Sequence, residues 1–257
     1  MLFSKFRESK YQVKINRRTI ITAIAAAPAF AGLSALVSKV KAEETGKFEV
    51  WFIRHGESEV NVLSERPELP SELPPDEGFT YPLTIKGIQQ VKALASSIQD
   101  IDVSAIFTST RLRTVQTADA ISFVKNLPIQ LAPQIVEVNF GTAALNSSDF
   151  SQIFQLLTDW LVNEEYDKKA PEGESYNDLR SRFVPFVTTT IEQYSNIPKV
   201  LIFVAHGAIL STMLPLIFKN VSRRFALANI LPNTGIVKGE LLHGDLICTD
   251  WNGVQPL

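Results

Sequence analysis

Residues 48–56 read FEVWFIRHG, an apolar and aromatic run that ends abruptly in Arg54 and His55. Such a run predicts a short buried strand. A charged side chain directly after a buried strand needs a partner, and a structural ion pair would not explain the histidine beside it. The run VLIFVAHG at 200–207 repeats the pattern, with His206 after the apolar residues. Taken alone, His206 could equally be a core histidine bonded to the backbone.

The rest of the chain alternates between helical and extended patterns. Helices are predicted over residues 84–99, 112–124, 149–163, 174–195 and 208–218. Further strands are predicted over 105–107 and 128–136, and a hairpin over 235–252 that turns at His243-Gly244. Residues 62–82 contain five prolines and five acids, which predicts a loop. The alternation predicts the α/β class, as a three-layer α/β/α sandwich with a mainly parallel central sheet.

Composition and charge exclude several classes of function. Cys248 is the one cysteine of the chain, so neither an internal disulfide nor a cysteine-based zinc site can form, and a buried strand position is expected for it. Residues 1–42 carry a net charge of +7 and the whole chain −2, so residues 43–257 are acidic. An acidic body argues against nucleic-acid binding, which needs lysines and arginines against the phosphates.

The first 42 residues resemble an export signal. A basic stretch ends in Arg17-Arg18, residues 19–38 carry no charge, and residues 40–42 (VKA) resemble a cleavage site. Paired arginines before a mildly apolar stretch are typical of twin-arginine signals. We therefore expect residues 1–42 to engage an export machinery, and residues 43–257 to form a domain that works in the periplasm or outside the cell. An ordinary secretory signal and an uncleaved membrane anchor stay open as alternatives.

Polar clusters follow the predicted strands. Arg54-His55, residues 109–113 and His206-Gly207 each stand where a strand ends, and in parallel sheets such ends form the ligand-binding edge. Phosphoryl transfer through a side chain needs a nucleophile, cations that neutralise the phosphoryl oxygens and an acid for the leaving alcohol. The clusters supply histidines and arginines, and Glu137 supplies a carboxyl at another predicted strand end. The set needs no metal and no other cofactor.

Short motifs, in order along the chain, resemble those of the histidine phosphatase superfamily in its phosphoglycerate-mutase-like branch. They lie at 54–61 (RHGESEVN), 83–90 (LTIKGIQQ), 109–118 (STRLRTVQTA), 137–141 (EVNFG), 171–175 (PEGES), 204–207 (VAHG) and 231–234 (LPNT). A lone RHG triplet is weak evidence, whereas an ordered set is strong. The resemblance covers about residues 48–240, nearly all of the expected mature chain.

The resemblance implies a phosphatase, of the histidine acid phosphatase type, that hydrolyses small phosphomonoesters through a phosphohistidine. His55 is the implied nucleophile, and Glu137 is the implied proton donor to the leaving group and then the base for water. The implied ligands of the phosphoryl oxygens are Arg54, Asn61, Arg113 and His206. These positions match the motifs of the family residue by residue.

Other positions receive different expectations. Glu57 is expected to orient His55 by a hydrogen bond near its ring, and Arg111 to be a bystander, because the arginine of the family motif falls at Arg113. Two acids are assigned to a helix start, Glu172 and Glu174. Residues 142–145 (TAAL) depart from the glycine-rich, tryptophan-containing stretch that is common in the family, so the sequence does not define the leaving group.

Two other functions stay open. A phosphoglycerate mutase would return the phosphoryl group to a sugar acid, but export argues against it, and the stretch between Gly141 and Pro171 leaves little room for a cap. A non-catalytic protein that binds phosphate or another protein is disfavoured, because every implied catalytic residue is present. The sequence does not determine the oligomeric state.

Overall fold

A computed structural model describes residues 47–62, 81–144 and 151–256. The expected export signal at 1–42 and most of the proline-rich segment at 62–82 lie outside these residues. What the sequence predicts for both segments therefore stays a prediction.

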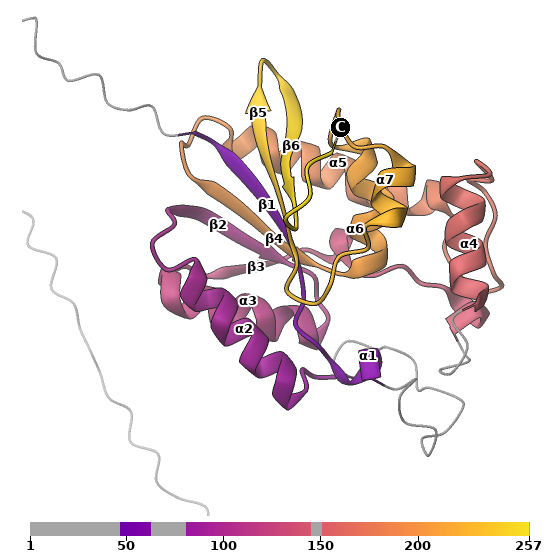
Figure 1. The fold of residues 1–257 in the computed structure, drawn as a ribbon, viewed down its shortest axis with the longest axis horizontal. Coiled ribbons are helices and arrows are strands. Elements are labelled where there is room, and N and C mark those ends of the chain that lie inside the picture. The colour runs from indigo at the N-terminus through magenta and orange to yellow at the C-terminus, as the bar shows by residue number, and fades with distance from the viewer. Residues whose placement is uncertain (1–46, 63–80, 145–150, 257) are drawn as a thin grey trace, which may run out of the picture. The chain divides into compact units, whose positions relative to one another are not determined.

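One sheet organises the described chain. Its strands are β1 (Glu49–Arg54), β2 (Val103–Thr108), β3 (Ile129–Leu131), β4 (Val200–Ala205), β5 (Ile236–Leu242) and β6 (Asp245–Trp251). They lie in the order β3-β2-β4-β1-β5-β6 (Figure 1). The first four strands of the chain run parallel, whereas β5 pairs antiparallel with β1 and β6 antiparallel with β5. The predicted hairpin is confirmed, and His243 at its turn has a left-handed φ of 52°.

Helices cover both faces of this sheet. They are α1 (Glu59–Val62), α2 (Ile85–Ser97), α3 (Leu112–Lys125), α4 (Ser151–Leu161), α5 (Tyr176–Tyr194), α6 (Gly207–Met213) and α7 (Arg223–Ala228). In Figure 1, α2 and α3 lie on one face, and α5 and α6 lie on the other. This arrangement confirms the predicted three-layer α/β/α sandwich with a mainly parallel sheet. Within residues 47–62, 81–144 and 151–256, no helix combines the length and apolarity needed to cross a membrane.

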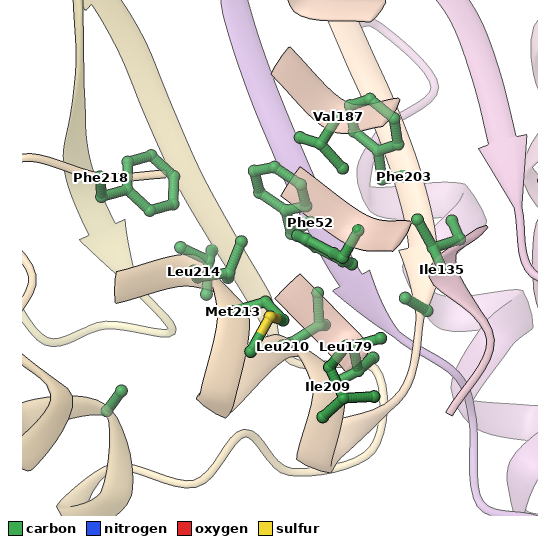
Figure 2. Close-up of a cluster of buried hydrophobic side chains, with 14 of the residues drawn as sticks. Phe52, Ile135, Leu179, Val187, Phe203, Ile209, Leu210, Met213, Leu214 and Phe218 are labelled. Atoms are coloured by element: carbon green, nitrogen blue, oxygen red, sulfur yellow. The ribbon is translucent and has the colours of Figure 1, made fainter. Parts of the chain in front are cut away.

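The alternation of side chains along β1 explains why both faces are covered. Successive residues of a strand point to opposite faces. Val50 and Phe52 join the core cluster on the α5–α6 side, whereas Trp51 and Ile53 join the cluster on the α2–α3 side. The strand is therefore apolar at every core position, which is typical of a central parallel strand. Figure 2 shows Phe52 with the side chains around it, which include Leu179, Val187, Phe203, Ile209, Leu210 and Met213.

Several element boundaries differ from the prediction. The predicted extended piece at 128–136 is β3 followed by a 3₁₀ turn, Pro133–Ile135, because proline suits the first position of such a turn and donates no strand hydrogen bond. The predicted helix at 208–218 ends as α6 at Met213 and gives way to a 3₁₀ turn, Leu214–Leu216, that carries a proline. The short helices α1 and α7 were not predicted, because neither is long enough to show helical periodicity.

Cys248 lies buried in β6, as predicted. Burial raises the pKa of its thiol to about 12, so the thiol is not poised to react. The tryptophans Trp51, Trp160 and Trp251 are also buried, and they serve packing.

Candidate active site

The backbone brings the polar clusters to one edge of the sheet. β1 ends at Arg54, β4 ends just before His206, and β2 ends just before Ser109. The hydrogen-bond ladder continues past the strands, because the His55 N–H donates to the Ala205 carbonyl at 3.1 Å and the Ser109 N–H donates to the Val204 carbonyl at 3.1 Å. The rings of His55 and His206 lie 5.2 Å apart between centroids. The expected convergence at the carboxyl ends of the strands is therefore present.

The hydrogen bonds of His55 define which ring nitrogen is free to react. Nδ1 lies 2.7 Å from the carbonyl oxygen of Gly56, and a carbonyl only accepts, so Nδ1 carries the proton. Nε2 then holds a lone pair, and the Nε–H of Arg113 donates to it at 3.2 Å. Arg113 comes from the first turn of α3 and is buried. The lone pair of Nε2 therefore points toward the guanidinium of Arg113. The positive charge of that group would also attract an anion.

Glu57 does not orient this ring, contrary to expectation. Its carboxylate accepts from Thr84 Oγ at 2.8 Å and from Lys86 Nζ at 2.6 Å, at the start of α2. The hydrogen bond from Lys86 lowers the pKa of Glu57, and that from Thr84 adds to it. Glu57 therefore anchors α2 to the loop after β1. The carbonyl of Gly56, which sequence patterns do not show, replaces it as the partner of His55.

Burial and nearby positive charge favour the neutral form of both site histidines. Burial lowers the pKa of His55 well below its usual value, and the positive charge of Arg113 lowers it further. Burial likewise lowers the pKa of His206, with added contributions from Arg113, His55 and Arg111. The expectation that Arg111 is a bystander to the phosphate stays a prediction. An unprotonated His55 is the form that can act as a nucleophile.

This electrostatic arrangement predicts a pH dependence. As the pH falls through about 6.5, the ordinary pKa of histidine, the imidazole NMR signals of His55 and His206 are expected to stay those of neutral rings in phosphate-free buffer. The unfolded chain takes up these protons near that pH and the folded chain only at lower pH. The free energy of unfolding is therefore expected to decrease as the pH falls below about 6.5. Protonation of either ring near pH 6.5 would contradict the assignment.

Arg54 reaches the site through a close approach to Gly207. Its Nη1 donates to the carbonyl of Leu231 at 2.6 Å, and a Cβ on residue 207 would lie 3.2 Å from its Cζ. The missing side chain at Gly207 thus leaves room for the guanidinium of Arg54. Burial lowers the pKa of Arg54, Glu137 opposes the shift, and Arg113 adds to it.

Two buried nitrogen atoms of the site lack a partner. Within the described part of the chain, neither Arg54 Nε nor His206 Nδ1 makes a hydrogen bond. The other ring nitrogen of His206 lies 2.7 Å from Ser109 Oγ, a residue to which the sequence assigned no role. Buried polar atoms are nearly always satisfied in proteins, so each of these nitrogens is available to bond a polar ligand.

Glu137 reaches the same place from an irregular segment rather than from a strand end. It follows the 3₁₀ turn Pro133–Ile135, which corrects the predicted position. Its Oε1 accepts from the N–H groups of Val138 at 2.9 Å and Ile209 at 2.8 Å, and its Oε2 accepts from that of Ala208 at 3.2 Å. These bonds fix the carboxylate at the start of α6. Its partner Ala208 directly follows Gly207, the glycine that lies beside Arg54.

Asn61 is held by its amide oxygen. Oδ1 accepts from the Ser58 N–H at 3.0 Å, from Ser58 Oγ at 3.1 Å and from Asn233 Nδ2 at 3.1 Å. These bonds leave the Nδ2 group of Asn61 as the donor that can face a ligand. Asn233 also donates to the His55 carbonyl at 3.2 Å, so it joins the two residues. The sequence contained Asn233 within a motif but gave no reason to assign it this role.

The combined arrangement can hold a tetrahedral anion. Two imidazoles, two guanidiniums and one carboxyl group converge, and the guanidiniums are the usual partners of phosphoryl oxygens. In the described residues, no three histidine, cysteine or acidic side chains are grouped so that they could hold a metal ion.

Comparison with known proteins places this geometry in a family. The model of the histidine phosphatase superfamily (branch 1) matches residues 50–253. The chain is 28% identical over 173 residues to the probable phosphoglycerate mutase GpmB of Escherichia fergusonii, which covers 65% of this chain and 75% of that protein. It is 26% identical over 184 residues to a probable phosphatase of Schizosaccharomyces pombe, which covers 69% and 59% of the two chains.

Solved structures show the same fold. A phosphoserine phosphatase from Entamoeba histolytica in complex with 3-phosphoglyceric acid superposes with a TM-score of 0.64 at 24% identity, covering 82% of this chain and 99% of that one. A mycobacterial glucosyl-3-phosphoglycerate phosphatase superposes with a TM-score of 0.63 at 17% identity, covering 80% and 99%. With a family match that spans nearly all of the described residues, the chain belongs to the histidine phosphatase superfamily, branch 1.

Proposed function

We propose that the protein is a phosphomonoesterase that transfers the phosphoryl group of a small substrate to Nε2 of His55 and then to water. One observation carries this proposal. The Gly56 carbonyl fixes the proton on Nδ1, so the lone pair of a neutral imidazole lies on Nε2 beside the Arg113 guanidinium. A nucleophile and the cation that attracts its target are thus already adjacent.

In the first step, the Nε2 lone pair of His55 attacks phosphorus, and the bond from phosphorus to the ester oxygen breaks. Arg113, which donates to Nε2 of His55 in the structure, turns its N–H groups to the phosphoryl oxygens. Arg54 Nε, His206 Nδ1 and the Asn61 amide supply further donors to those oxygens. The phosphorylated imidazolium keeps its Nδ1–H bond to Gly56, which stabilises the positive charge.

Glu137 gives its proton to the leaving oxygen in that step. Its Oε1 already accepts two backbone N–H bonds and its Oε2 accepts one, so Oε2 has room for the proton. In the second step, water attacks phosphorus, the bond from phosphorus to Nε2 breaks, and the electron pair returns to the imidazole. Glu137 takes the proton of that water, so inorganic phosphate leaves and the protein returns to its starting state.

The substrate is proposed to be a small phosphorylated metabolite, and the enzyme to be of the acid phosphatase type. The low pKa of His55 keeps the nucleophile unprotonated in mildly acidic solution, which favours activity there. Structures similar to this chain hold phosphoserine and 3-phosphoglyceric acid, which supports a small phosphomonoester. The acidic charge of residues 43–257 argues against nucleic acid as a substrate.

A generic aryl phosphate tests this function. The purified domain, residues 43–257, is expected to release phosphate without added metal, and EDTA is expected to leave the rate unchanged. Phosphoglycerate separates the phosphatase from the mutase that the bacterial relative suggests. Release of inorganic phosphate supports the phosphatase, whereas isomerisation without release identifies a mutase. No turnover of any phosphate ester would favour a non-catalytic binding protein.

We also propose that residues 1–42 direct export and are removed. The sequence supports this, with its paired arginines, uncharged stretch and small-residue site at 40–42. Cleavage is expected just after Ala42, and N-terminal sequencing of the exported protein measures it. Exported protein that still begins at Met1 would instead indicate an uncleaved anchor. Replacement of Arg17 and Arg18 by lysine is expected to stop export only if the twin-arginine route is used.

A further inference from the structure

The segment that carries Glu137 needs support, because it belongs to neither a strand nor an α-helix. Arg182 of α5 supplies that support through backbone carbonyl groups. Its Nη1 donates to the carbonyls of Gln134 at 2.7 Å and Val136 at 2.9 Å, and its Nη2 donates to that of Glu137 at 3.3 Å. One guanidinium therefore holds the backbone on the N-terminal side of the Glu137 carboxylate and at Glu137 itself.

Glu174 completes the arrangement from the other side. Arg182 Nε donates to Glu174 Oε1 at 2.7 Å, and Arg182 Nη2 donates to Oε2 at 2.9 Å. Oε2 also accepts the Asn139 N–H at 2.9 Å, and the Glu174 N–H donates to the Asn139 carbonyl at 2.8 Å. With three bonds to carbonyls and two to the carboxylate, the five N–H groups of the guanidinium are all used.

We propose that Arg182 and Glu174 are positioning residues for Glu137. They hydrogen-bond the backbone at 134–137 and at 139. These bonds determine the position of the Glu137 carboxylate relative to the leaving oxygen. The hydrogen bonds that the described residues show for Arg182 and Glu174 go to Gln134, Val136, Glu137, Asn139 and one another, not to the phosphate ligands. This inference rests on the proposed proton transfer by Glu137, which requires a heavy-atom distance of about 2.6–3.2 Å.

Lysine in place of Arg182 distinguishes a positioning role from that of an ion pair that only stabilises the fold. A salt bridge at the surface contributes little to stability, and lysine would preserve much of its charge interaction. Lysine cannot reproduce the planar fork that bonds several carbonyls at once. Loss of the fork lets the Glu137 segment shift, and a displacement of about 1 Å at a reacting group can cost on the order of 100-fold in rate.

The test compares two leaving groups in Arg182→Lys and Glu174→Gln. For an alkyl phosphate, whose alkoxide must be protonated, kcat is expected to fall roughly 10- to 100-fold with little change in KM. For an aryl phosphate, whose phenolate leaves without a proton, kcat/KM, which reports only the transfer to His55, is expected to change less than about threefold. Arg180→Lys is the matched control, since Arg180 is an exposed residue of the same helix, and it is expected to change neither rate.

Glu137→Gln supplies the reference for a lost proton donor. Adding Arg182→Lys to Glu137→Gln is expected to slow the alkyl phosphate no further, because no proton donor is left to position. Equal slowing of both substrates by Arg182→Lys and by Glu174→Gln would overturn the positioning role. If Arg182→Lys does not fold, Glu174→Gln alone decides in the same way. If Glu137→Gln itself slows both substrates equally, the proposed proton transfer fails instead.

Discussion

Replacement of His55 by alanine is expected to abolish turnover of every phosphomonoester, with kcat lowered by about 10³-fold or more. The reason is chemical rather than structural. Alanine removes the Nε2 lone pair, and the other imidazole, His206, offers none, because its Nε2 is bonded to Ser109 and its Nδ1 is the proposed donor to the phosphoryl group. The phosphate ligands Arg54 and Arg113 would remain, so the variant is still expected to bind inorganic phosphate. Steady-state release of phosphate from an aryl phosphate measures the effect.

A trapping experiment identifies the covalent intermediate directly. Acid-labile and base-stable label from a ³²P-substrate is expected on the wild-type chain and is expected to vanish in His55→Ala. His243→Ala is the matched control, because the chain has three histidines and His243 lies on the exposed turn between β5 and β6. That control is expected to keep both label and turnover. Full activity in His55→Ala would end the proposed mechanism.

Glu137→Gln is expected to lower kcat/KM for alkyl phosphates by roughly 10²- to 10⁴-fold, whereas kcat/KM for aryl phosphates, which reports only the transfer to His55, keeps most of its value. The amide of glutamine retains the shape of the side chain, and its oxygen can keep the Val138 and Ile209 N–H bonds that Oε1 now accepts. It carries no transferable acidic proton. A series of substrates ordered by the pKa of the leaving alcohol measures the effect as a steeper dependence of kcat/KM on that pKa.

The second half of the reaction gives an independent readout of Glu137. If the carboxylate also takes the proton of the attacking water, phosphohistidine is expected to accumulate in Glu137→Gln when the substrate is an aryl phosphate. A burst of phenol release, followed by a slow steady state, is the expected time course. Equal slowing of alkyl and aryl substrates without a burst would assign Glu137 a structural role. The inhibition constant of inorganic phosphate serves as the control for an intact pocket.

The sequence predicted the parts of the site that lie next to strongly patterned segments. The apolar runs before Arg54 and His206 identified two neighbouring strands, and parallel pairing of these strands places their following residues side by side. The motif at 109–118 placed Arg113 on the first turn of a helix. These inferences hold because strand periodicity and helix capping depend on a few neighbouring residues, so short stretches of sequence show them.

The contacts that orient the site could not be predicted in this way. Glu57 was assigned to the ring of His55 because it is close in sequence, but it bonds Thr84 and Lys86, and a carbonyl takes its place. Backbone carbonyls exist at every residue and leave no compositional signal. Glu174 was read as an acid at a helix start, yet it pairs with Arg182, a residue that no motif singled out. The hydrogen-bond partner of each of these side chains depends on packing between segments that are distant in sequence.

The hydrogen bond from Arg54 to the Leu231 carbonyl joins positions 177 residues apart, and β1 lies between strands that come late in the chain. During synthesis, β1 emerges early and must wait for β4 and β5 before it has a partner on either side. The native surroundings of the nucleophile therefore cannot form until almost the whole domain has been made. Chains interrupted before position 231 are expected to lack phosphate affinity, and folding governed by such distant contacts is slow.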